Sequence, residues 1–216
     1  MNELYSKPLV IIGAGGHATV LAEVLQQQPV IAIVSPEKPE ALVFEGIKHI
    51  QNDDDLVNMW PPEDVLLVNG IGQLPNKHVR RKVAEFYQDL GYQFATVVSP
   101  AALVSNSVVL GSGAQVLCGA IIHGETKIGA HSIINTGAIV EHHCQVAEHC
   151  HIAPSSTLCG GVSVAKNSHI GASATILPLV SIGEECMVGA GAVVTQNLVE
   201  RHRVYGPIST IKTERL

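Results

Sequence analysis

The sequence predicts two structural units of different class: a small Rossmann-like α/β domain over residues 1–99 and a parallel β-helix over residues 100–216. Two observations predict this division. Before residue 99, short runs rich in Val and Ile alternate with helical patterns. After Val104, the chain instead follows a period of six residues, which fits neither an α-helix nor a single strand.

The apolar runs of the first unit are expected to form strands at residues 8–13, 30–34, 65–70 and 94–98. Helical patterns lie between them at residues 18–28 and 77–91. The second helix is expected to bury an apolar face of Val79, Val83 and Phe86. Because strands and helices alternate, the sheet of this domain is expected to be mainly parallel.

The second unit is defined by a repeat. Every sixth residue from Val104 to Val194 is Val, Ile or Leu, at all sixteen positions and without a change of phase. A second series, four residues further along each hexad, holds only small or β-branched residues. This is the hexapeptide repeat of a parallel β-helix, in which each hexad forms a short strand and a turn, and three hexads close one triangular coil. Both series are expected to point inward.

The segment NTGAIVEHHCQVAEHCH, residues 135–151, concentrates four of the eleven histidines and two of the five cysteines. The repeat register places Cys144 and Cys150 at the small inward position, which removes two apparent zinc ligands. The histidines of this segment are expected on the outer surface or the turns. One coil away from His142 the chain has Gly124 and Gly160, which offer no ligand, so we expect no metal site.

An exposed imidazole at neutral pH is suited to general base catalysis, and this favours a chemical role for His142 and His151. A second group of histidines needs no chemical role and is expected to lie at the surface: His123, His131, His149 and His169.

Short motifs in both units are shared with a known family: GAGGHA after the first strand, NGIG after the third, KHVRRKV in the second helix, and HIAP and LCGGV in the repeats. A more specific pattern is matched by Asn135, Thr136, Val140, Glu141, His142, His151 and Ile152. With these motifs the whole chain resembles the family of sialic acid O-acetyltransferases and bacillosamine-pathway N-acetyltransferases, within the hexapeptide-repeat acyltransferases. The resemblance implies that the β-helix is left-handed.

The resemblance also implies roles for individual residues. His142 would be the catalytic base that deprotonates the acceptor, with His143 beside it where relatives usually have an acidic residue. Either Glu141 or Glu148 would orient His142, or its basicity would be lower. Asn135 would belong to the substrate site. The acetyl-CoA site, in a channel between two β-helices of a homotrimer, would comprise His151, Gly160, Ala172 and Ala190.

The turn GAGGHA, residues 13–18, follows a strand and opens a helix, so its amides can hold a diphosphate at the helix N-terminus. It also matches a loose NAD fingerprint. However, Ser35-Pro36 stands where an acidic residue would bind the ribose, and the domain is about half the size of a full doubly wound fold. We therefore expect it to bind the diphosphate of a UDP-sugar, with a turn needed only for packing as the alternative. The residues concerned are Gly15, Gly16, His17 and Gly72.

These features predict an acetyl-CoA-dependent N-acetyltransferase that acts on a UDP-linked 4-amino-sugar for surface glycan synthesis. Direct transfer from acetyl-CoA requires no covalent enzyme intermediate, only a base and a donor for the developing oxyanion. The first alternative is an O-acetyltransferase acting on sialic acid or a related nonulosonate. The second is a non-catalytic β-helix scaffold, which the pattern around His142 and His151 disfavours.

Composition limits the partners. The net charge is −6 and there are no runs of Lys and Arg, which argues against nucleic acid or an anionic membrane. The N-terminus lacks the basic start of a signal peptide, and no apolar stretch is long enough to insert into a membrane. We therefore expect a cytoplasmic protein, in which five cysteines without regular spacing are reduced thiols.

Overall fold

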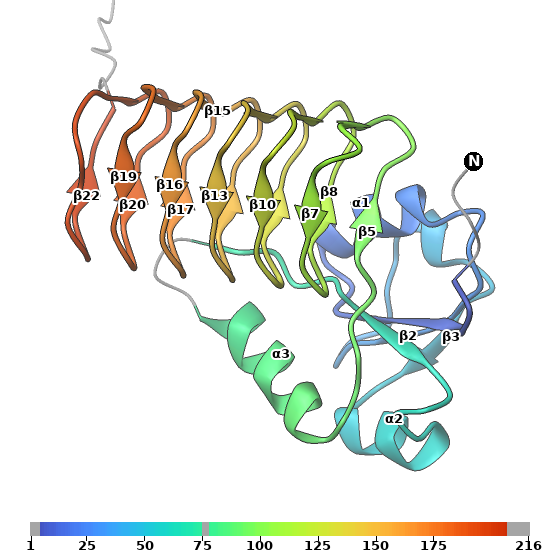
Figure 1. Cartoon of the computed structure of the whole chain (residues 1–216). Helices are drawn as coiled ribbons and strands as arrows, with labels where there is room; N and C mark the ends of the chain where they lie inside the picture. Colours follow the sequence, from blue (N-terminus) through green and yellow to red (C-terminus); the bar gives the residue numbers. More distant parts are fainter. Residues whose placement is uncertain (1–4, 75–77, 207–216) are drawn as a thin grey trace, which may run out of the picture.

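The computed structural model describes residues 5–74 and 78–206, which form an N-terminal α/β domain beside a long β-helix (Figure 1). In the domain, four parallel strands form one sheet in the order β3-β2-β1-β4. These strands are β1 (Leu9–Ile12), β2 (Val30–Val34), β3 (Lys48–Ile50) and β4 (Leu66–Asn69). The helices are α1 (Gly16–Val24), α2 (Asp53–Met59) and α3 (Val79–Asp89), with a short 3-10 helix η1 (Leu42–Phe44). The expected parallel α/β class is confirmed.

Apolar side chains cover both faces of this sheet. Successive residues of a strand point to opposite faces, and β1 illustrates the consequence. Leu9 and Ile11 pack in the core that contains α1, whereas Val10 and Ile12 pack in the core that contains α2 and α3. The central strand is therefore buried on both sides, as its unbroken apolar sequence requires.

Helix α3 buries a different face from the predicted one. Val79 is 54% exposed and Phe86 43% exposed, while Arg80, Ala84 and Tyr87 are buried. The apolar face predicted from residue spacing was thus wrong at two of its three positions. The physical reason is that a buried arginine, whose head group donates to backbone carbonyls, replaces an apolar residue on the inner side. Residue 77, where the predicted helix began, lies outside the described residues.

The run predicted as a strand at residues 94–98 is divided between the two units. Phe94 forms a single bridge to Leu67 in the domain. The strand β5 (Val97–Val98) pairs with β8 and is already part of the β-helix. The prediction of one further strand in the α/β sheet was therefore wrong, because a short apolar run does not specify the sheet that it joins.

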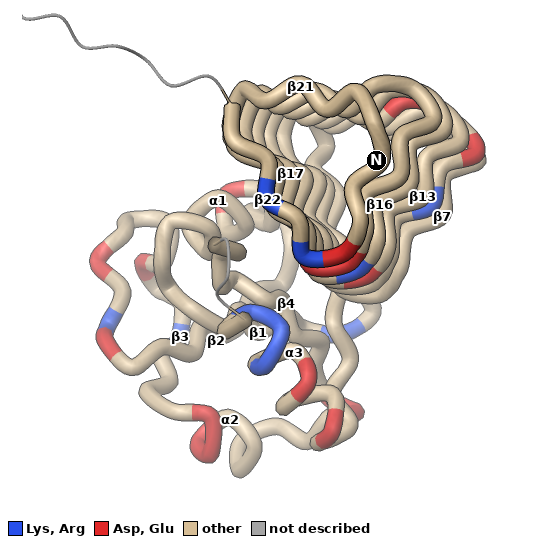
Figure 2. Tube along the Cα trace, turned by 90° about the vertical axis from the view of Figure 1, so that its left-hand side faces the viewer, with Lys and Arg blue, Asp and Glu red and all other residues tan. Residues whose placement is uncertain are grey.

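The β-helix consists of three parallel sheets (Figures 1 and 2). The first contains β5, β8 (Gln115–Val116), β11 (Ile133–Ile134), β14 (His151–Ile152), β17 (His169–Ile170), β20 (Met187–Val188) and β22 (Arg203–Val204). The second contains β6 (Leu103–Val104), β9 (Ile121–Ile122), β12 (Ile139–Val140), β15 (Thr157–Leu158), β18 (Thr175–Ile176) and β21 (Val193–Val194). The third contains β7 (Val109–Leu110), β10 (Lys127–Ile128), β13 (Gln145–Val146), β16 (Ser163–Val164) and β19 (Ser181–Ile182).

The predicted repeat register is confirmed inside the β-helix. Strand partners lie three hexads apart, as in the pair of Ile133 with His151. The aliphatic residues of the hexads form one continuous core, and Cys144 and Cys150 are fully buried within it. The five cysteines are free thiols. The turns also follow the period, since every sixth residue from Gly113 to Gly191 has a positive φ.

The N-terminal domain lies against the first sheet of the β-helix (Figure 2). Leu117 and Ile133 of the β-helix are buried in the same cluster as Leu9 and Leu21 of the domain. In a three-sided coil, the corner between the second and third sheets lies opposite the first sheet. That corner is therefore the part of each coil furthest from the domain.

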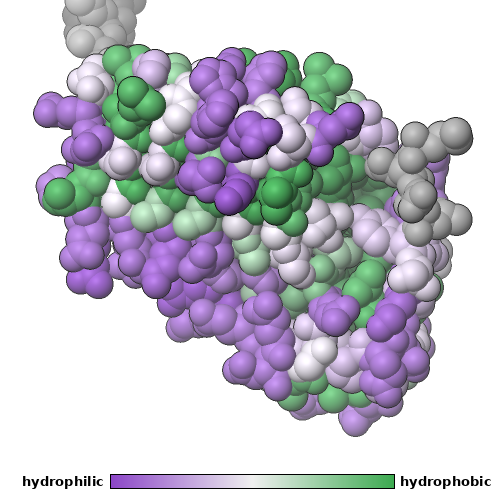
Figure 3. All heavy atoms as spheres, in the orientation of Figure 1, coloured by the Kyte–Doolittle hydropathy of each residue, from purple (hydrophilic) through white to green (hydrophobic). Residues whose placement is uncertain are grey.

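Figure 3 shows hydrophilic residues over the lower part of the molecule and apolar residues interspersed along the β-helix. The exposed apolar residues of the β-helix include Leu103, Val109 and Val193, which are each more than half exposed. Within residues 5–74 and 78–206, none of the helices has both the length and the apolar character needed to span a membrane.

Candidate active site

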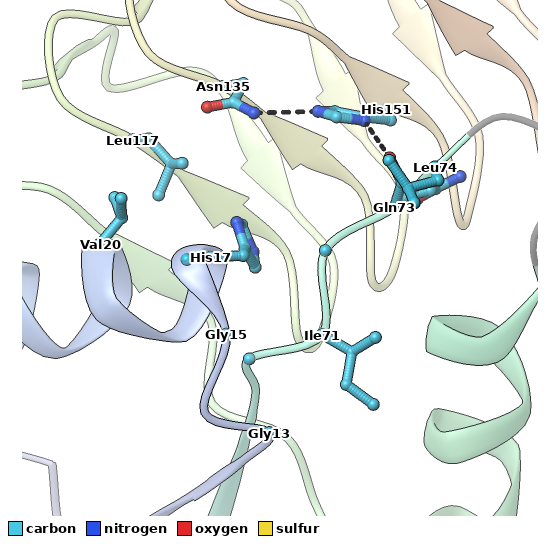
Figure 4. Close-up of a pocket in the computed structure, with 13 residues that line it drawn as sticks. Gly13, Gly15, His17, Val20, Ile71, Gln73, Leu74, Leu117, Asn135 and His151 are labelled. Carbon is cyan, nitrogen blue, oxygen red and sulfur yellow. Dashed lines mark hydrogen bonds between the residues drawn. The ribbon is translucent and has the colours of Figure 1, made fainter. Parts of the chain in front are cut away.

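A cavity of about 570 Å³ lies between the N-terminal domain and the first sheet (Figure 4). Its walls are the glycine turn before α1, the segment after β4 and the adjoining coils of the β-helix, with lining residues Gly13, Gly15, Gly16, His17, Val20, Gly70, Ile71, Gly72, Gln73, Leu74, Leu117, Asn135 and His151. We call it the interdomain cavity. All five residues predicted to bind the substrate line it, together with His151, which was predicted for acetyl-CoA.

The glycine turn gives this cavity a wall of backbone. Gly13 has φ +97°, a conformation that favours glycine. Gly70 permits close packing, since a Cβ there would lie 2.8 Å from Cβ of Ala18. Helix α1 begins at Gly16, and its N-cap Gly15 has no side chain to cap it. The first N–H groups of a helix have no intrahelical acceptor, so this end of α1 is suited to a phosphate.

His17 connects α1 to the β-helix. Its Nε2 donates to Oε1 of Gln115 over 2.7 Å, which leaves Nδ1 as an acceptor. The amide of Gln115 donates in turn to the backbone carbonyl of Asn69 over 2.9 Å. Burial, together with the charge of Arg80, lowers the pKa of His17 to about 4, although the hydrogen bond to Gln115 opposes the shift. His17 is therefore neutral at physiological pH.

His151 connects the β-helix to the segment after β4. The amide of Asn135 donates to Nε2 of His151 over 2.9 Å, and Nδ1 of His151 donates to the backbone carbonyl of Gln73 over 3.1 Å (Figure 4). Burial, with contributions from His169 and other nearby groups, lowers its pKa to about 3. With both nitrogens engaged and no tendency to take up a proton, His151 holds the two units together and is poorly suited to act as a base.

The expectation that these histidines lie on the outer surface was wrong for His151, which is 8% exposed, and for His131, which is 1% exposed. Both point outward from the coil, as the register requires, but the N-terminal domain covers them. His131 stacks on His149 with ring centroids 5.0 Å apart. The repeat predicts the direction of a side chain, whereas it contains no information on the surface that packs against it.

His142 and His143 lie elsewhere, between β12 and β13, at the corner opposite the first sheet. Both are exposed. Their Nδ1 atoms are 3.0 Å apart, so one ring donates to the other. The ring of His142 lies over Gly160 of the next coil, where a Cβ would be 2.7 Å from Cε1 and 2.8 Å from Nε2. The glycine at position 160 therefore provides the space that the imidazole occupies.

Neither carboxylate considered for orienting His142 contacts it in the part of the chain that the structure describes. Glu141 faces His123, with Oε2 3.9 Å from Nε2. Glu148 lies at the corner between the third and first sheets, where its carbonyl accepts from the amide of Asn167. The nearest polar partner of His142 is thus His143.

The residues predicted for the acetyl-CoA channel do not meet within one chain. Gly160 lies beside His142, whereas Ala172 and Ala190 are exposed at the corner between the first and second sheets. These two alanines occupy equivalent places in successive coils, where the amide of Gly191 donates to the carbonyl of Ala172 over 2.8 Å. The second sheet separates this corner from Gly160.

Three residues that the sequence did not indicate take part in the interdomain cavity or support it: Gln73, Arg80 and Gln115. Gln73 directly follows the NGIG motif, and this position in the sequence could have indicated that it lies at the site. Gln115 occupies an outward position of its hexad, which the register identifies as able to face a partner. The apolar pattern does not identify Arg80, and the available signal was its place in the motif KHVRRKV. Among the residues that the structure describes, no group of three or more His, Cys, Asp or Glu is arranged to hold a metal ion.

Comparison with known proteins gives the family. Residues 8–87 match the PglD N-terminal domain. Over 99% of its length the chain is 34% identical to perosamine N-acetyltransferase from Caulobacter crescentus, covering 100% of that protein with a TM-score of 0.84. That relative was solved with CoA and GDP-perosamine, as a variant in which one histidine is replaced by asparagine. The chain belongs to this family of sugar N-acetyltransferases.

Other family members extend the comparison. The acetyltransferase domain of PglB from Neisseria gonorrhoeae FA1090 is 28% identical, with a TM-score of 0.84 and coverage of 93% of this chain and 97% of that domain. It has also been solved with acetyl coenzyme A. UDP-N-acetylbacillosamine N-acetyltransferase from Bacillus subtilis (strain 168) is 35% identical over 116 residues, and the chain spans about half the length of this curated relative (51%).

Membership of the sugar N-acetyltransferases confirms the family resemblance seen in the sequence and the fold class, an α/β domain followed by a left-handed parallel β-helix. The predicted acyltransferase class is that of these relatives. The alternative of O-acetylation is not favoured, because these relatives are N-acetyltransferases.

Proposed function

We propose that this protein transfers the acetyl group of acetyl-CoA to the amino group of a UDP-linked 4-amino-sugar, and that the product serves surface glycan synthesis. The observation that carries the proposal is the interdomain cavity. It combines an uncapped helix N-terminus suited to a diphosphate with Asn135 and His17, which can orient a sugar. The family of the chain supports acetyl-CoA as the donor.

In the proposed reaction the amine nitrogen attacks the thioester carbonyl, and a base removes a proton from that nitrogen. The C–S bond then breaks, and the base returns the proton to the departing sulfur, so that the coenzyme leaves as a thiol. His142 is the proposed base. If Nδ1 of His142 carries its proton and donates to Nδ1 of His143, then Nε2 is free to accept the proton of the amine. His143 thereby takes the orienting position that an acidic residue has in relatives. A single positioned base of this kind contributes about 10²–10⁴ in rate.

The base and the acceptor cavity of one chain lie on different sides of the β-helix, so the proposed active site combines His142 of one chain with the interdomain cavity of another. The second sheet supports such an assembly, because the outward positions of its strands are uncharged: Leu103, Ile121, Ile139, Thr157, Thr175 and Val193. An uncharged face of this kind is suited to contact with another subunit. We propose that the assembly is a closed homotrimer. The cytoplasmic location of the protein stays a prediction.

The same assembly would bring Gly160 of one chain near Ala172 and Ala190 of its neighbour. These three small residues at exposed corners leave room for the long, narrow pantetheine arm of acetyl-CoA. Backbone N–H groups at such corners can also donate to the oxyanion that develops on the thioester carbonyl. The proposed coenzyme channel therefore runs between two β-helices.

The nucleotide base is the finer part of the proposal. A second cavity of about 610 Å³ shares Gly15 with the interdomain cavity and is lined by Ser35, Pro36, Glu37 and Glu40, among others. Its two carboxylates can contact ribose hydroxyls, although Ser35-Pro36 stands directly after β2, where relatives often have acidic residues. The Bacillus relative, whose name includes a UDP-linked sugar, favours UDP. The full-length Caulobacter relative was solved with GDP-perosamine, so a GDP-linked sugar is the second candidate.

A direct assay tests the proposal. Purified protein is incubated with acetyl-CoA and a panel of UDP- and GDP-linked sugars with and without a 4-amino group, and free thiol release is followed. We expect thiol release that depends on the amino group, with the acetylated product identified by mass spectrometry. Equal thiol release with the sugars that lack the 4-amino group would contradict the proposal.

A further inference from the structure

One buried cation lies behind the interdomain cavity. Arg80 of α3 is 2% exposed, and its Nη1 donates to the backbone carbonyls of Asn69 and Ile71, each over 2.7 Å. These two carbonyls flank Gly70, in the segment that forms one wall of the cavity. The guanidinium is thus held directly behind that wall by the backbone that builds it.

Arg80 has no carboxylate partner among the described residues. No ion pair is formed by Arg80, and its Nε and Nη2 atoms have no hydrogen-bond partner there. A buried charge of this kind is costly unless another charge compensates it. Burial lowers the pKa of Arg80 to about 9, which still leaves it a cation at neutral pH. The folded protein therefore maintains an uncompensated positive charge beside the cavity.

The positive charge reaches the residues of the cavity. Burial is the main cause that lowers the pKa values of His17 and His151, and the charge of Arg80 lowers both further. The backbone carbonyl of Asn69 accepts from both Arg80 and Gln115, and Gln115 holds His17. Arg80 is therefore connected to the substrate-facing residues by geometry as well as by its electric field.

We infer that Arg80 is a positioning residue for the diphosphate of the nucleotide sugar, acting through its charge from behind the cavity wall. The helix N-terminus at Gly15 and Gly16 offers N–H donors to the cavity, and Arg80 supplies a full positive charge behind the wall formed by the segment after β4. A bound diphosphate would compensate the buried cation. This inference rests on the proposed function and adds the group that makes the site selective for a charged ligand.

The neutral state of His17 fits this inference. Burial first, and then the charge of Arg80, disfavours the imidazolium form of His17, and so His17 keeps Nδ1 as an acceptor. An acceptor can bind a sugar hydroxyl or amino group but not a phosphate oxygen. The diphosphate is then assigned to the backbone amides and Arg80, and His17 to the sugar.

The experiment compares the binding of UDP and uridine by titration calorimetry, with GDP and guanosine as a second pair. The variant Arg80→Met removes the charge with similar chain length. We expect the dissociation constant for the diphosphate to rise by about 10- to 100-fold, as for the loss of a charge interaction in a partly desolvated site. Binding of the nucleoside should be unchanged, because it carries no charge for Arg80 to attract.

Two further variants serve as controls. Arg81→Met removes the adjacent, partly exposed arginine, which pairs with Glu85 on the same helix, and should leave both affinities unchanged. Arg80→Lys keeps the charge and should keep most of the preference for the diphosphate. If Arg80→Met does not fold, Arg80→Gln replaces it, since its amide can still donate to the carbonyl of Asn69 or Ile71.

Two outcomes would overturn the inference. If Arg80→Met weakens the binding of the diphosphate and of the nucleoside equally, Arg80 only supports the fold. If the affinity for the diphosphate is unchanged, the charge of Arg80 does not contribute to binding in the cavity. Failure of the wild-type protein to bind either UDP or GDP is a different result, because it would contradict the proposed nucleotide-sugar site itself.

Discussion

The reactivity of His142 depends on which of its nitrogens carries a proton. When its Nδ1 donates to His143, Nε2 becomes the acceptor, and the ring is held by one hydrogen bond and by its contact with Gly160. A neutral imidazole in place of a carboxylate orients the ring but stabilises its protonated form less. The identity of residue 143 should therefore tune the base without creating or abolishing it.

This argument gives a prediction for the histidine pair. His142→Ala should lower kcat by about two to four orders of magnitude with substrate binding retained, because the base is removed. His143→Ala should be much milder, and His143→Glu should leave kcat unchanged or raise it, since a carboxylate stabilises the imidazolium. Steady-state kinetics across pH provide the measurement. An equal decrease of kcat in His142→Ala and His143→Ala would show that both rings take part in the proton transfer.

Gly160 gives a second prediction. The substitution Gly160→Ala would place a Cβ within 2.8 Å of the ring of His142 and displace it. A displaced base should lower kcat by about 10- to 100-fold while the protein stays folded. Gly124→Ala is the matched control at the same corner two coils earlier, where a Cβ meets only the hydroxyl of Ser107. An increase in the KM for acetyl-CoA alone would instead favour a role for Gly160 limited to the coenzyme channel.

Single residues also mark the limit of what the sequence can predict. The hexad register correctly placed Cys144 and Cys150 inside the coil and His142 outside it. It could not predict that His151 is buried, because the covering surface comes from a segment more than seventy residues earlier, at Gln73. Arg80 was missed for a related reason, since a buried arginine breaks the apolar pattern that identifies the inner face of a helix.

Among secondary-structure elements, the interface between α1, the segment after β4 and the first sheet is rich in neutral histidines. Burial lowers the pKa of His17 and His131 to about 4 and that of His151 to about 3, from an ordinary value near 6.5. In the unfolded chain these groups bind protons at a higher pH than in the folded protein. Their contribution to the free energy of unfolding is therefore fully present above about pH 6.5, and it decreases as the pH falls towards 4.

The pH dependence of unfolding tests this interface. We expect the urea midpoint to fall between pH 7 and pH 4.5, with each buried histidine contributing about 3 kcal/mol at most. His131→Leu removes one such group and should make the decrease smaller. His202→Gln, at an exposed position, should leave the decrease unchanged. A pH dependence that is identical in all three proteins would show that buried histidines do not govern it.

The elements themselves differed in how well the sequence predicted them. The strands and turns of the β-helix follow from a period that repeats without interruption, so each hexad confirms the register of its neighbours. The run at residues 94–98 has no such support, and its two ends joined different sheets. Local pattern thus determines elements inside a repeat, while the junction between units depends on packing.

For the whole molecule, the N-terminal domain covers the first sheet, and His142 lies at the opposite corner of the coil. The central claim of this account is that one active site takes its acceptor cavity from one chain and its base from a neighbour. The repeat predicted a flat-sided β-helix, but the relation of the cavity to the base requires the position of the domain, which only the structure provides.

Mixing two inactive variants tests this claim most directly. Gly15→Asp should cap α1 and place a carboxylate where the diphosphate binds, while a Cβ at Gly15 meets no other atom within 4 Å. His142→Ala removes the base. When the two are unfolded and refolded together in equal amounts, we predict recovery of about a quarter of wild-type activity, the fraction of sites that receive both intact parts in random trimers. Mixtures that stay inactive, although mass spectrometry shows mixed trimers, would contradict the shared active site.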